Sequence, residues 1–357
     1  MYSLCNYATS LWLFLAGAVF GLLSCTTQAE EPLPLARQLD TLFQHYVDTS
    51  SFSGTVLVAD SSGILYSDAV GYQNFAQQTP MTLHTAFYLA SLSKNIHAAA
   101  IMYLADQGKL HFDDTLSQYL PDIPFSQQIT LRQLLTHTHG IPDYYAFTET
   151  FPGLTNDDVL KSIGTIDSLN FKPGTQFSYS NSGYALLVRI VEIVSEQRYA
   201  DFMQTTFFDP IGMQHTVIFD ELADSIPNRA VAINTQGEPD NYQFRTVGGG
   251  GIFSTIEDLY QWDRALNSKQ YIRPETMQMA YTPVTFLDGS PYPYGFGWFL
   301  SPDHPHFVYH TGSLNGFRNY VGRWLDEQKL VILMSNNQHP APEPLIQAIY
   351  QTLSSPS

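Results

Sequence analysis

The sequence predicts an α+β fold in which one antiparallel sheet, flanked by helices, carries a mainly helical insert. Strand-like segments lie near both ends of the chain, at residues 53–71 and 294–335, whereas helical periodicity and long loops dominate the middle. A chain of 357 residues that is 44% hydrophobic can bury a core of this size. We therefore expect an α/β part from residues 34–85 and 245–357 and a helical part from residues 86–244, with a functional site at their junction.

The first half of the sheet and its covering helices have clear local signals. Two prolines, at positions 32 and 34, precede an expected helix over residues 35–47. Residues 53–59 and 64–71 are typical of two strands joined by a polar turn. Ile96 opens an apolar stripe of helical spacing that continues to residue 104, and Gly108 stands where a helix would end.

The C-terminal part predicts the rest of the sheet. Ser254-Thr255-Ile256-Glu257 is typical of a capping box that opens a helix reaching about residue 266. The expected strands cover residues 294–300, 318–325 and 330–335, and a closing helix covers residues 345–353. Strands from both ends of the chain would then share one sheet.

Residues 1–25 are predicted to be a signal peptide. Their apolar run at 11–23 is shorter than the ~18 residues of a membrane span and suits the core of an export signal, although the ten residues before it lack Lys and Arg. Leu22-Leu23-Ser24-Cys25 resembles the lipobox of bacterial lipoproteins, in which the cysteine is lipidated. Cleavage after Thr27-Gln28-Ala29 is the alternative. We expect export, to the periplasm or to a membrane through a lipid anchor on Cys25.

Charge and cysteine content exclude several classes of protein. The chain has 16 Lys and Arg against 33 Asp and Glu, a net charge of −17, which repels nucleic-acid phosphates. Cys5 and Cys25 both lie in the leader, so the mature chain has no internal disulfide, catalytic cysteine or cysteine zinc site. His137-x-His139 and His304-x-His306 lie in expected loops, and we predict no metal and no cofactor.

Ser91 and Lys94 form the first candidate for chemistry. They lie three residues apart at the start of the strong helix, on the same side. The free backbone N–H groups and the positive end of the helix dipole there favour an oxyanion. A lysine that acts as a base near pH 7 must lower its pKa by about 3 from ~10.4, which burial can supply. The alternative is a capping serine and a solvated lysine.

Two further patterns bring polar groups together. In an extended segment Tyr179 and Asn181 would face one cleft, with a phenol to relay a proton and an amide to hold a substrate carbonyl. His310 and Thr311 would place a cation and a hydroxyl on a strand edge, and Gly312 allows close approach of an extended substrate. Taken singly, the first pattern also fits an ordinary loop and the second a strand that ends in a turn.

Together, the three patterns in this order resemble the signature of the serine β-lactamases and penicillin-binding proteins. The resemblance is to the branch with class C β-lactamases, D-alanyl-D-alanine carboxypeptidases and related esterases. It covers roughly residues 36–353 and implies the β-lactamase/transpeptidase-like fold. Flanking segments agree: Phe87–Ala90, Ile129–Gly140, Lys172–Gly174 and Tyr294–Trp298.

The resemblance implies a role for each candidate residue and an exported serine hydrolase. Ser91 would be acylated, and Lys94 and Tyr179 would share proton transfer. The remaining roles are substrate binding by Asn181 and Thr311, a cation at His310, close approach at Gly312, and oxyanion donors at the N–H groups of Ser91 and Ser313. We expect a monomer that acts on a small-molecule or peptide substrate as a D-alanyl-D-alanine carboxypeptidase or an esterase.

Two departures from the family pattern affect the expected activity. A histidine stands at 310 where β-lactamases usually have lysine, and its ordinary pKa of ~6.5 predicts a weaker, pH-dependent hold on a carboxylate. No Glu-x-x-Leu-Asn, which class A enzymes use for deacylation, follows Thr138. Both departures favour a peptidase or an esterase over an efficient β-lactamase, and a class C-like β-lactamase remains an alternative. A non-catalytic penicillin-binding sensor or envelope lipoprotein is the other alternative.

Gly248–Gly251 is predicted to pack its backbone closely against the site.

Overall fold

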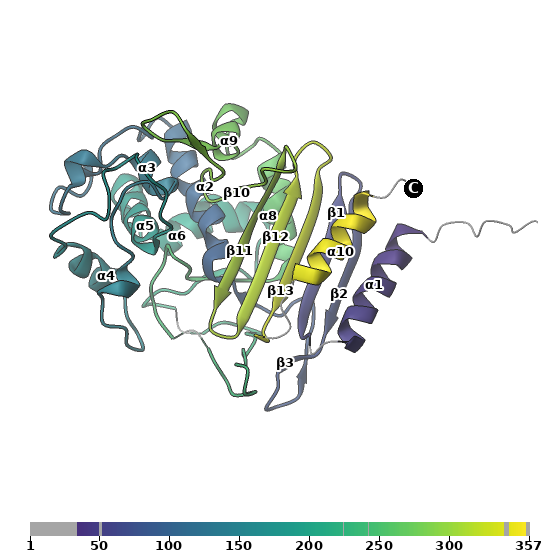
Figure 1. The fold of residues 1–357 in the computed structure, drawn as a ribbon. Coiled ribbons are helices and arrows are strands. Elements are labelled where there is room, and N and C mark those ends of the chain that lie inside the picture. The colour runs from purple at the N-terminus through teal and green to yellow at the C-terminus, as the bar shows by residue number, and fades with distance from the viewer. Residues whose placement is uncertain (1–33, 50–51, 224, 242, 339–342, 355–357) are drawn as a thin grey trace, which may run out of the picture. The chain divides into compact units, whose positions relative to one another are not determined.

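The protein was analysed as a computed structural model that describes residues 34–354, except residues 50, 51, 224, 242 and 339–342. The expected signal peptide and the lipobox at Cys25 lie outside the described residues. The α+β prediction is confirmed, since one antiparallel sheet with helices on both faces is joined to a mainly helical region (Figure 1). No helix in the described ranges is both long and apolar enough to cross a membrane.

The main sheet has six antiparallel strands in the order β10-β11-β12-β13-β1-β2. The first and last strands of the chain pair with each other inside the sheet, where Gly54 of β1 lies opposite Ser335 of β13. The sheet is therefore built from both ends of the chain, as the sequence predicts. The strands are β1 (Gly54–Asp60), β2 (Gly63–Val70), β10 (Phe299–Leu300), β11 (Phe307–Leu314), β12 (Phe317–Trp324) and β13 (Lys329–Ser335).

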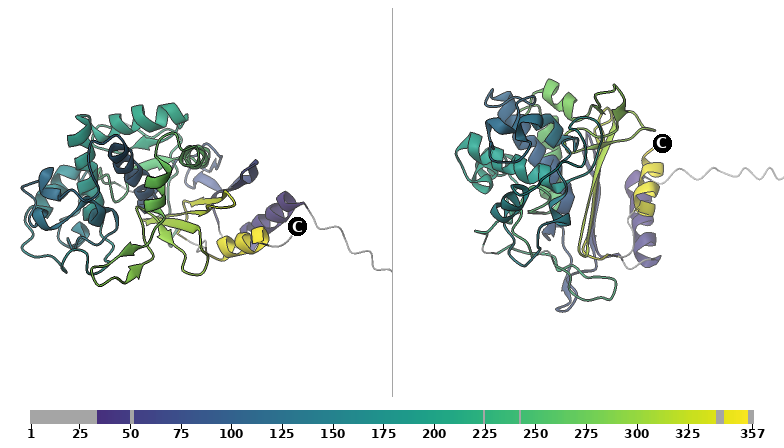
Figure 2. Two further views of the ribbon diagram at one scale, coloured as in Figure 1. Left: turned by 90° about the horizontal axis from the view of Figure 1, so that it is seen from above. Right: turned by 60° about the vertical axis from the view of Figure 1, so that its left-hand side comes forward.

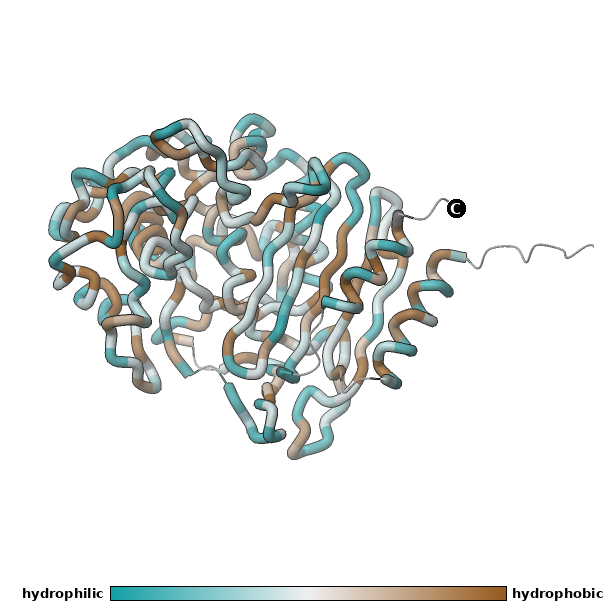
Figure 3. The backbone as a smooth tube through the Cα atoms, in the orientation of Figure 1, coloured by the Kyte–Doolittle hydropathy of each residue, from teal (hydrophilic) through white to brown (hydrophobic). Residues whose placement is uncertain are grey.

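Two terminal helices cover one face of this sheet. In Figure 2, α1 (Leu35–Thr49) and α10 (Glu343–Ser354) lie together on the side opposite the other helices. Hydrophobic residues recur between hydrophilic ones along α1 (Figure 3), and its buried residues Leu39 and Phe43 lie four positions apart. This spacing is the pattern of a helix with one buried face. Phe43 of α1 and Ile349 of α10 belong to one buried cluster that also includes Val331 of β13.

On the other face, α8 (Ile256–Asn267) packs against β13 and β1. Helix α2 (Ser93–Asp106) packs against α8, where the Trp262 indole donates to Asn95 Oδ1 at 3.2 Å, and the α2 residues from Ser93 to Met102 are all buried. The helix ends shortly before Gly108, which has a φ of +69°. Further helices are α3 (Leu131–Leu135), α4 (Asn156–Ile163), α5 (Asn181–Ser195), α6 (Tyr199–Met203), α7 (Asp209–Ile211), α8 (Ile256–Asn267) and α9 (Pro274–Ala280). Short strands are β3 (Tyr72–Asn74), β4 (Thr79–Pro80), β5 (Phe87–Tyr88), β6 (Val217–Ile218), β7 (Ile252–Ser254), β8 (Val284–Thr285) and β9 (Pro291–Tyr292).

The strand expected over residues 294–300 is wrong except for its last two residues, which form β10. Gly295 and Gly297 explain the difference. A Cβ on Gly295 would lie 2.0 Å from the carbonyl oxygen of Ala280, and Gly297 has a φ of +75°, in the left-handed region. The glycines let this segment fold as a loop against α9 and α2.

The capping box expected at Ser254–Glu257 is also wrong, by one residue. Thr255 is the N-cap of α8, and its hydroxyl accepts from the backbone N–H of Asp258 at 3.2 Å. Ser254 ends β7 instead, and its hydroxyl hydrogen-bonds that of Thr216 at 2.7 Å. The helix itself begins and ends within one residue of the predicted positions.

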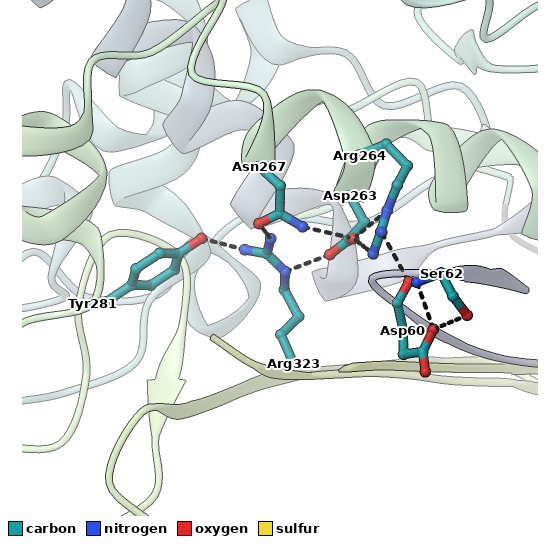
Figure 4. A network of polar contacts seen from close by, with 7 residues as sticks. All are labelled: Asp60, Ser62, Asp263, Arg264, Asn267, Tyr281 and Arg323. Atoms are coloured by element: carbon teal, nitrogen blue, oxygen red, sulfur yellow. Dashed lines mark hydrogen bonds and ion pairs between the residues drawn. The ribbon is translucent and has the colours of Figure 1, made fainter. Parts of the chain in front are cut away.

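A buried network ties α8 to the sheet (Figure 4). Arg323 of β12 donates from Nε to Asp263 of α8 at 2.6 Å, and it also contacts the Tyr281 hydroxyl and the side chain of Asn267. Arg264 extends the network to the carbonyl oxygen of Asp60 at 3.0 Å. These contacts fix α8 against both β12 and the end of β1.

Candidate active site

Ser91 lies in a 3-10 turn, Ala90–Leu92, directly before α2. Ala90 has a φ of 51°, a left-handed conformation that costs a non-glycine residue roughly 1–2 kcal/mol. Such conformations persist where the surrounding structure enforces them, and they are frequent at functional sites. Ser91 is partly exposed, whereas both of its neighbours are buried. The turn therefore presents the Ser91 hydroxyl from a tightly held backbone.

Lys94 is fully buried one turn further along, and its ammonium has three acceptors. Its Nζ lies 3.2 Å from Ser91 Oγ, 2.8 Å from Asn181 Oδ1 and 2.8 Å from the carbonyl oxygen of Gly249. Burial lowers the pKa of Lys94 to about 7, against an opposing effect of Asp143. The alternative of a solvated lysine is therefore wrong.

Tyr179 and Asn181 both face Lys94, as an extended segment predicts. Ser180 between them is extended, with φ −146° and ψ 125°, and Asn181 is the first residue of α5. Lys94 Nζ lies 4.7 Å from the centroid of the Tyr179 ring. Burial raises the pKa of the Tyr179 phenol, and the nearby Ser91 hydroxyl opposes this shift. Tyr179 is therefore a neutral phenol beside a partly neutral lysine.

The third motif lies on β11 and does not end the strand. β11 continues through His310–Ser313 to Leu314, and a Cβ on Gly312 would lie 2.0 Å from the carbonyl oxygen of Leu89. The strand therefore runs directly against the turn that carries Ser91. Within the described residues β10 pairs with β11 at Val308 and Tyr309 alone. Thr311 and Ser313 are exposed on the part of the edge that continues beyond β10.

His310 is buried and neutral. Its Nδ1 lies 2.7 Å from the carbonyl oxygen of Thr311, and its Nε2 lies 3.3 Å from the Tyr294 hydroxyl. Because a carbonyl oxygen only accepts, Nδ1 carries the proton and Nε2 accepts from the tyrosine. Burial lowers the pKa of His310 to about 3, and the Lys94 charge contributes. At neutral pH this ring supplies no cation to a substrate.

Two buried histidines support the site, and the sequence did not predict their roles. The His137 ring packs on Tyr179 with ring centroids 4.2 Å apart and planes inclined by 31°, and it accepts from the N–H of Ser180 at 3.2 Å. His97 contacts the carbonyl oxygen of Gly250 at 2.9 Å and the Tyr199 hydroxyl at 2.5 Å. Burial lowers the pKa of both rings, so both are neutral supports.

The glycine run packs against the site as predicted. The carbonyl oxygen of Gly249 accepts from Lys94, and a Cβ on Gly249 would lie 2.8 Å from Asn181 Oδ1. Among the residues that the structure describes, no group of three or more His, Cys, Asp or Glu side chains is arranged to hold a metal. His304 and His306 are exposed.

Asp143 belongs to the site, although nothing in the sequence singles it out. Its Oδ2 accepts from both the backbone N–H and the side-chain Nδ2 of Asn181, each at 2.8 Å. Its Oδ1 accepts from the N–H of Tyr145 at 3.1 Å. A single aspartate in a loop is a common pattern, and only the fold shows that it contacts α5.

Comparison with known proteins places these features in a family. The β-lactamase family model matches residues 39–354. Penicillin-binding protein 4* of Bacillus subtilis is 32% identical over 326 residues, which cover 85% of this chain and 72% of that protein. A penicillin-binding protein from Bacillus halodurans has a solved structure with 27% identity and a TM-score of 0.76, covering 88% of this chain and 98% of that one. A class C β-lactamase, at 21% identity and a TM-score of 0.75, shares the fold over 90% of this chain and 96% of its own.

Proposed function

This chain belongs to the β-lactamase family of serine hydrolases, and we propose that it cleaves an ester or amide bond through an acyl-enzyme on Ser91. The observation that carries this proposal is the contact set of Lys94, which joins Ser91, Asn181 and Gly249 at one buried amine. A buried lysine with a pKa of about 7 is half neutral at neutral pH and can act as a general base.

The geometry suggests how the neutral amine would act. A neutral lysine has two N–H bonds and one lone pair. The acceptors at Asn181 and Gly249 take the two hydrogens at 2.8 Å each, which leaves the lone pair for the Ser91 hydroxyl at 3.2 Å. The Tyr179 phenol, with its raised pKa, keeps its proton and serves as a relay rather than as the base.

In the proposed acylation, Ser91 Oγ forms a bond to the carbonyl carbon of the substrate while its proton passes to Lys94 Nζ. The backbone N–H groups of Ser91 and Ser313 would hold the oxyanion. The tetrahedral intermediate then collapses, and the leaving alcohol or amine takes the proton from Lys94 through Tyr179. Water attacks the acyl-enzyme in the same way, which releases the acid and restores Ser91.

The state of His310 favours an uncharged substrate. Recognition of a carboxylate at the third motif needs a cation, and His310 is neutral and turned toward Tyr294. Esters and amides without a carboxylate beside the scissile bond need no such partner. We therefore place an esterase-like or amidase-like activity first.

A D-alanyl-D-alanine carboxypeptidase is the second candidate. The edge of β11 that continues past β10 and carries Thr311 and Ser313 favours it, since an extended peptide can pair with a strand edge. The similarity to penicillin-binding proteins of two Bacillus species also favours it. A class C-like β-lactamase and a penicillin-binding sensor without turnover are the remaining alternatives.

Parallel turnover assays test this proposal. The substrates are a p-nitrophenyl ester, a peptide that ends in D-Ala-D-Ala and a chromogenic cephalosporin, with the Ser91→Ala variant as the control. We expect the highest kcat/KM for the ester and no turnover by the variant. Intact-mass spectrometry with a fluorophosphonate should show one adduct, which Ser91→Ala loses. Failure of the wild-type protein to turn over any substrate or to form an adduct would contradict the proposal and favour a non-catalytic binder.

We also propose that the protein is exported and anchored through a lipid on Cys25. The apolar segment at residues 11–23 and the Leu22–Cys25 sequence support this proposal.

A further inference from the structure

We propose that Asp143 is a positioning residue that fixes the amide of Asn181 and sets the pH range in which Lys94 acts as a base. This inference rests on the proposed acylation of Ser91. It concerns a loop residue that lies outside all three motifs found in the sequence.

The contacts of Asp143 form a clamp on Asn181. One carboxylate oxygen receives both the backbone N–H and the side-chain amide of Asn181 at 2.8 Å. The other oxygen receives the N–H of Tyr145 at 3.1 Å, which caps the 3-10 turn Tyr144–Ala146 and holds the carboxylate in place. Both oxygens are therefore engaged, and the carboxylate has a fixed orientation.

The clamp decides which end of the amide faces the lysine. The oxygen and nitrogen of an asparagine amide have nearly the same shape, so a free side chain can turn either end toward a neighbour. Because Asp143 holds Nδ2, Oδ1 points to Lys94 Nζ at 2.8 Å. If the amide were reversed, the Nδ2 hydrogens of Asn181 would point at the N–H bonds of Lys94, and this hydrogen bond would be lost. The second hydrogen of Nδ2 remains available to a substrate carbonyl.

The charge of Asp143 acts on the same amine. The other titratable groups around Lys94 are neutral, because burial lowers the pKa of the histidines and raises the pKa of the tyrosines: His97, His137, His310, Tyr179 and Tyr184. Asp143 opposes the effect of burial and keeps the pKa of Lys94 from falling further. Removing this charge would make the lysine neutral at lower pH.

The experiment measures the pH dependence of Ser91 acylation by a fluorophosphonate in the wild type and in Asp143→Asn, which keeps one acceptor oxygen and removes the charge. We expect the acid limb of the acylation rate to move to lower pH by about one unit. Asp143→Ala loses the clamp as well and should acylate roughly 10- to 100-fold more slowly. Asp158→Asn is the matched control, because Asp158 completes the capping box of α4 by accepting from the N–H of Thr155, and no hydrogen bond or ion pair found among the described residues links it to Lys94.

The outcomes separate this inference from the proposed function. An acid limb that stays at the wild-type pH in Asp143→Asn overturns the role of the charge. An unchanged rate in Asp143→Ala overturns the role of the clamp. If Asp143→Asn does not fold, the same pH profile is measured in Asp143→Ser, which removes the charge but keeps a hydroxyl that can accept from the N–H of Tyr145. Absence of any wild-type adduct would contradict the proposed function itself, and this inference with it.

Discussion

The Nζ of Lys94 lies 2.8 Å from the carbonyl oxygen of Gly249, although 155 residues separate them. The glycine is required there for space. A Cβ on Gly249 would lie 2.8 Å from Asn181 Oδ1 and 3.0 Å from Asn181 Cβ. Since Asp143 and Lys94 both hold the asparagine, its side chain cannot move aside without losing a hydrogen bond.

We predict that Gly249→Ala slows Ser91 acylation roughly 10- to 100-fold, because it displaces the amide that accepts from Lys94. The thermal unfolding temperature should fall by only a few degrees, since the added methyl group displaces one side chain and Gly249 does not need a positive φ. Gly164→Ala is the control, because a Cβ there would meet only backbone atoms of α4. Its nearest neighbour would be the carbonyl oxygen of Lys161, 3.2 Å away. Equal acylation rates in the two variants would contradict the close contact.

Lys94 as the base predicts the shape of the pH profile. The amine must be neutral to take a proton, so kcat/KM should rise with pH through the pKa of about 7 and then level off. Lys94→Arg keeps the positive charge but does not deprotonate, and it should lose roughly 10²- to 10⁴-fold in kcat/KM at every pH. An active arginine variant would exclude Lys94 as the base.

His310 should not titrate during catalysis. With its pKa lowered to about 3, its charge is constant from about pH 5 to 8. The ratio of kcat/KM for a carboxylate-bearing and a neutral substrate of similar size should therefore not change over this range. His310→Lys introduces the cation found in β-lactamases and should shift this ratio toward the carboxylate substrate. A ratio that falls with rising pH in the wild type would show that protonated His310 binds the carboxylate.

The buried pair of Asp263 and Arg323 should be important for stability. Both side chains are nearly inaccessible to solvent, so Asp263→Ala leaves an unpaired buried guanidinium. The free energy of unfolding should fall by about 3–5 kcal/mol. The exposed pair of Asp113 and Arg132 is the matched control, and Asp113→Ala should cost at most about 1 kcal/mol. Urea unfolding of both variants measures the difference.

The proposed lipid anchor predicts a change in location. Cys25→Ser removes the thiol that would be acylated, so the protein should move from the membrane fraction to the soluble exported fraction. Unchanged fractionation of the variant would contradict the lipid anchor and favour cleavage after Ala29 or a retained leader.

The parts of the molecule that depend on local patterns could be predicted from the sequence. Ser91 and Lys94 are one helical turn apart, and Tyr179 and Asn181 are two residues apart, so their relative directions follow from backbone geometry. The apolar runs of β1 and β13 likewise indicate buried strands. The order of the three motifs then resembled that of a known family, and this resemblance predicted the β-lactamase/transpeptidase-like fold.

The features that depend on distant contacts could not be predicted in this way. Asp143 is 38 residues from Asn181 in the sequence, and no local pattern links them. The neutral state of His310 follows from its burial against Tyr294, in the segment where a strand was expected and a loop was found. This segment forms a loop because Gly295 and Gly297 lie in close contact with the backbones of α9 and α2, and no local pattern reveals those contacts.

The pairing of β1 with β13 also constrains when the protein can become active. The Ser335 hydroxyl donates to the carbonyl oxygen of Ser53, 282 residues earlier in the chain. Strand β11, which lies against the turn with Ser91, is translated more than 200 residues after Ser91. A nascent chain still lacking its last strands would have the nucleophile but neither the neighbouring strand β11 nor the β1–β13 pair. Long-range pairings of this kind form late and slowly. The chain should therefore stay catalytically silent until its C-terminal strands have been made and have paired with β1.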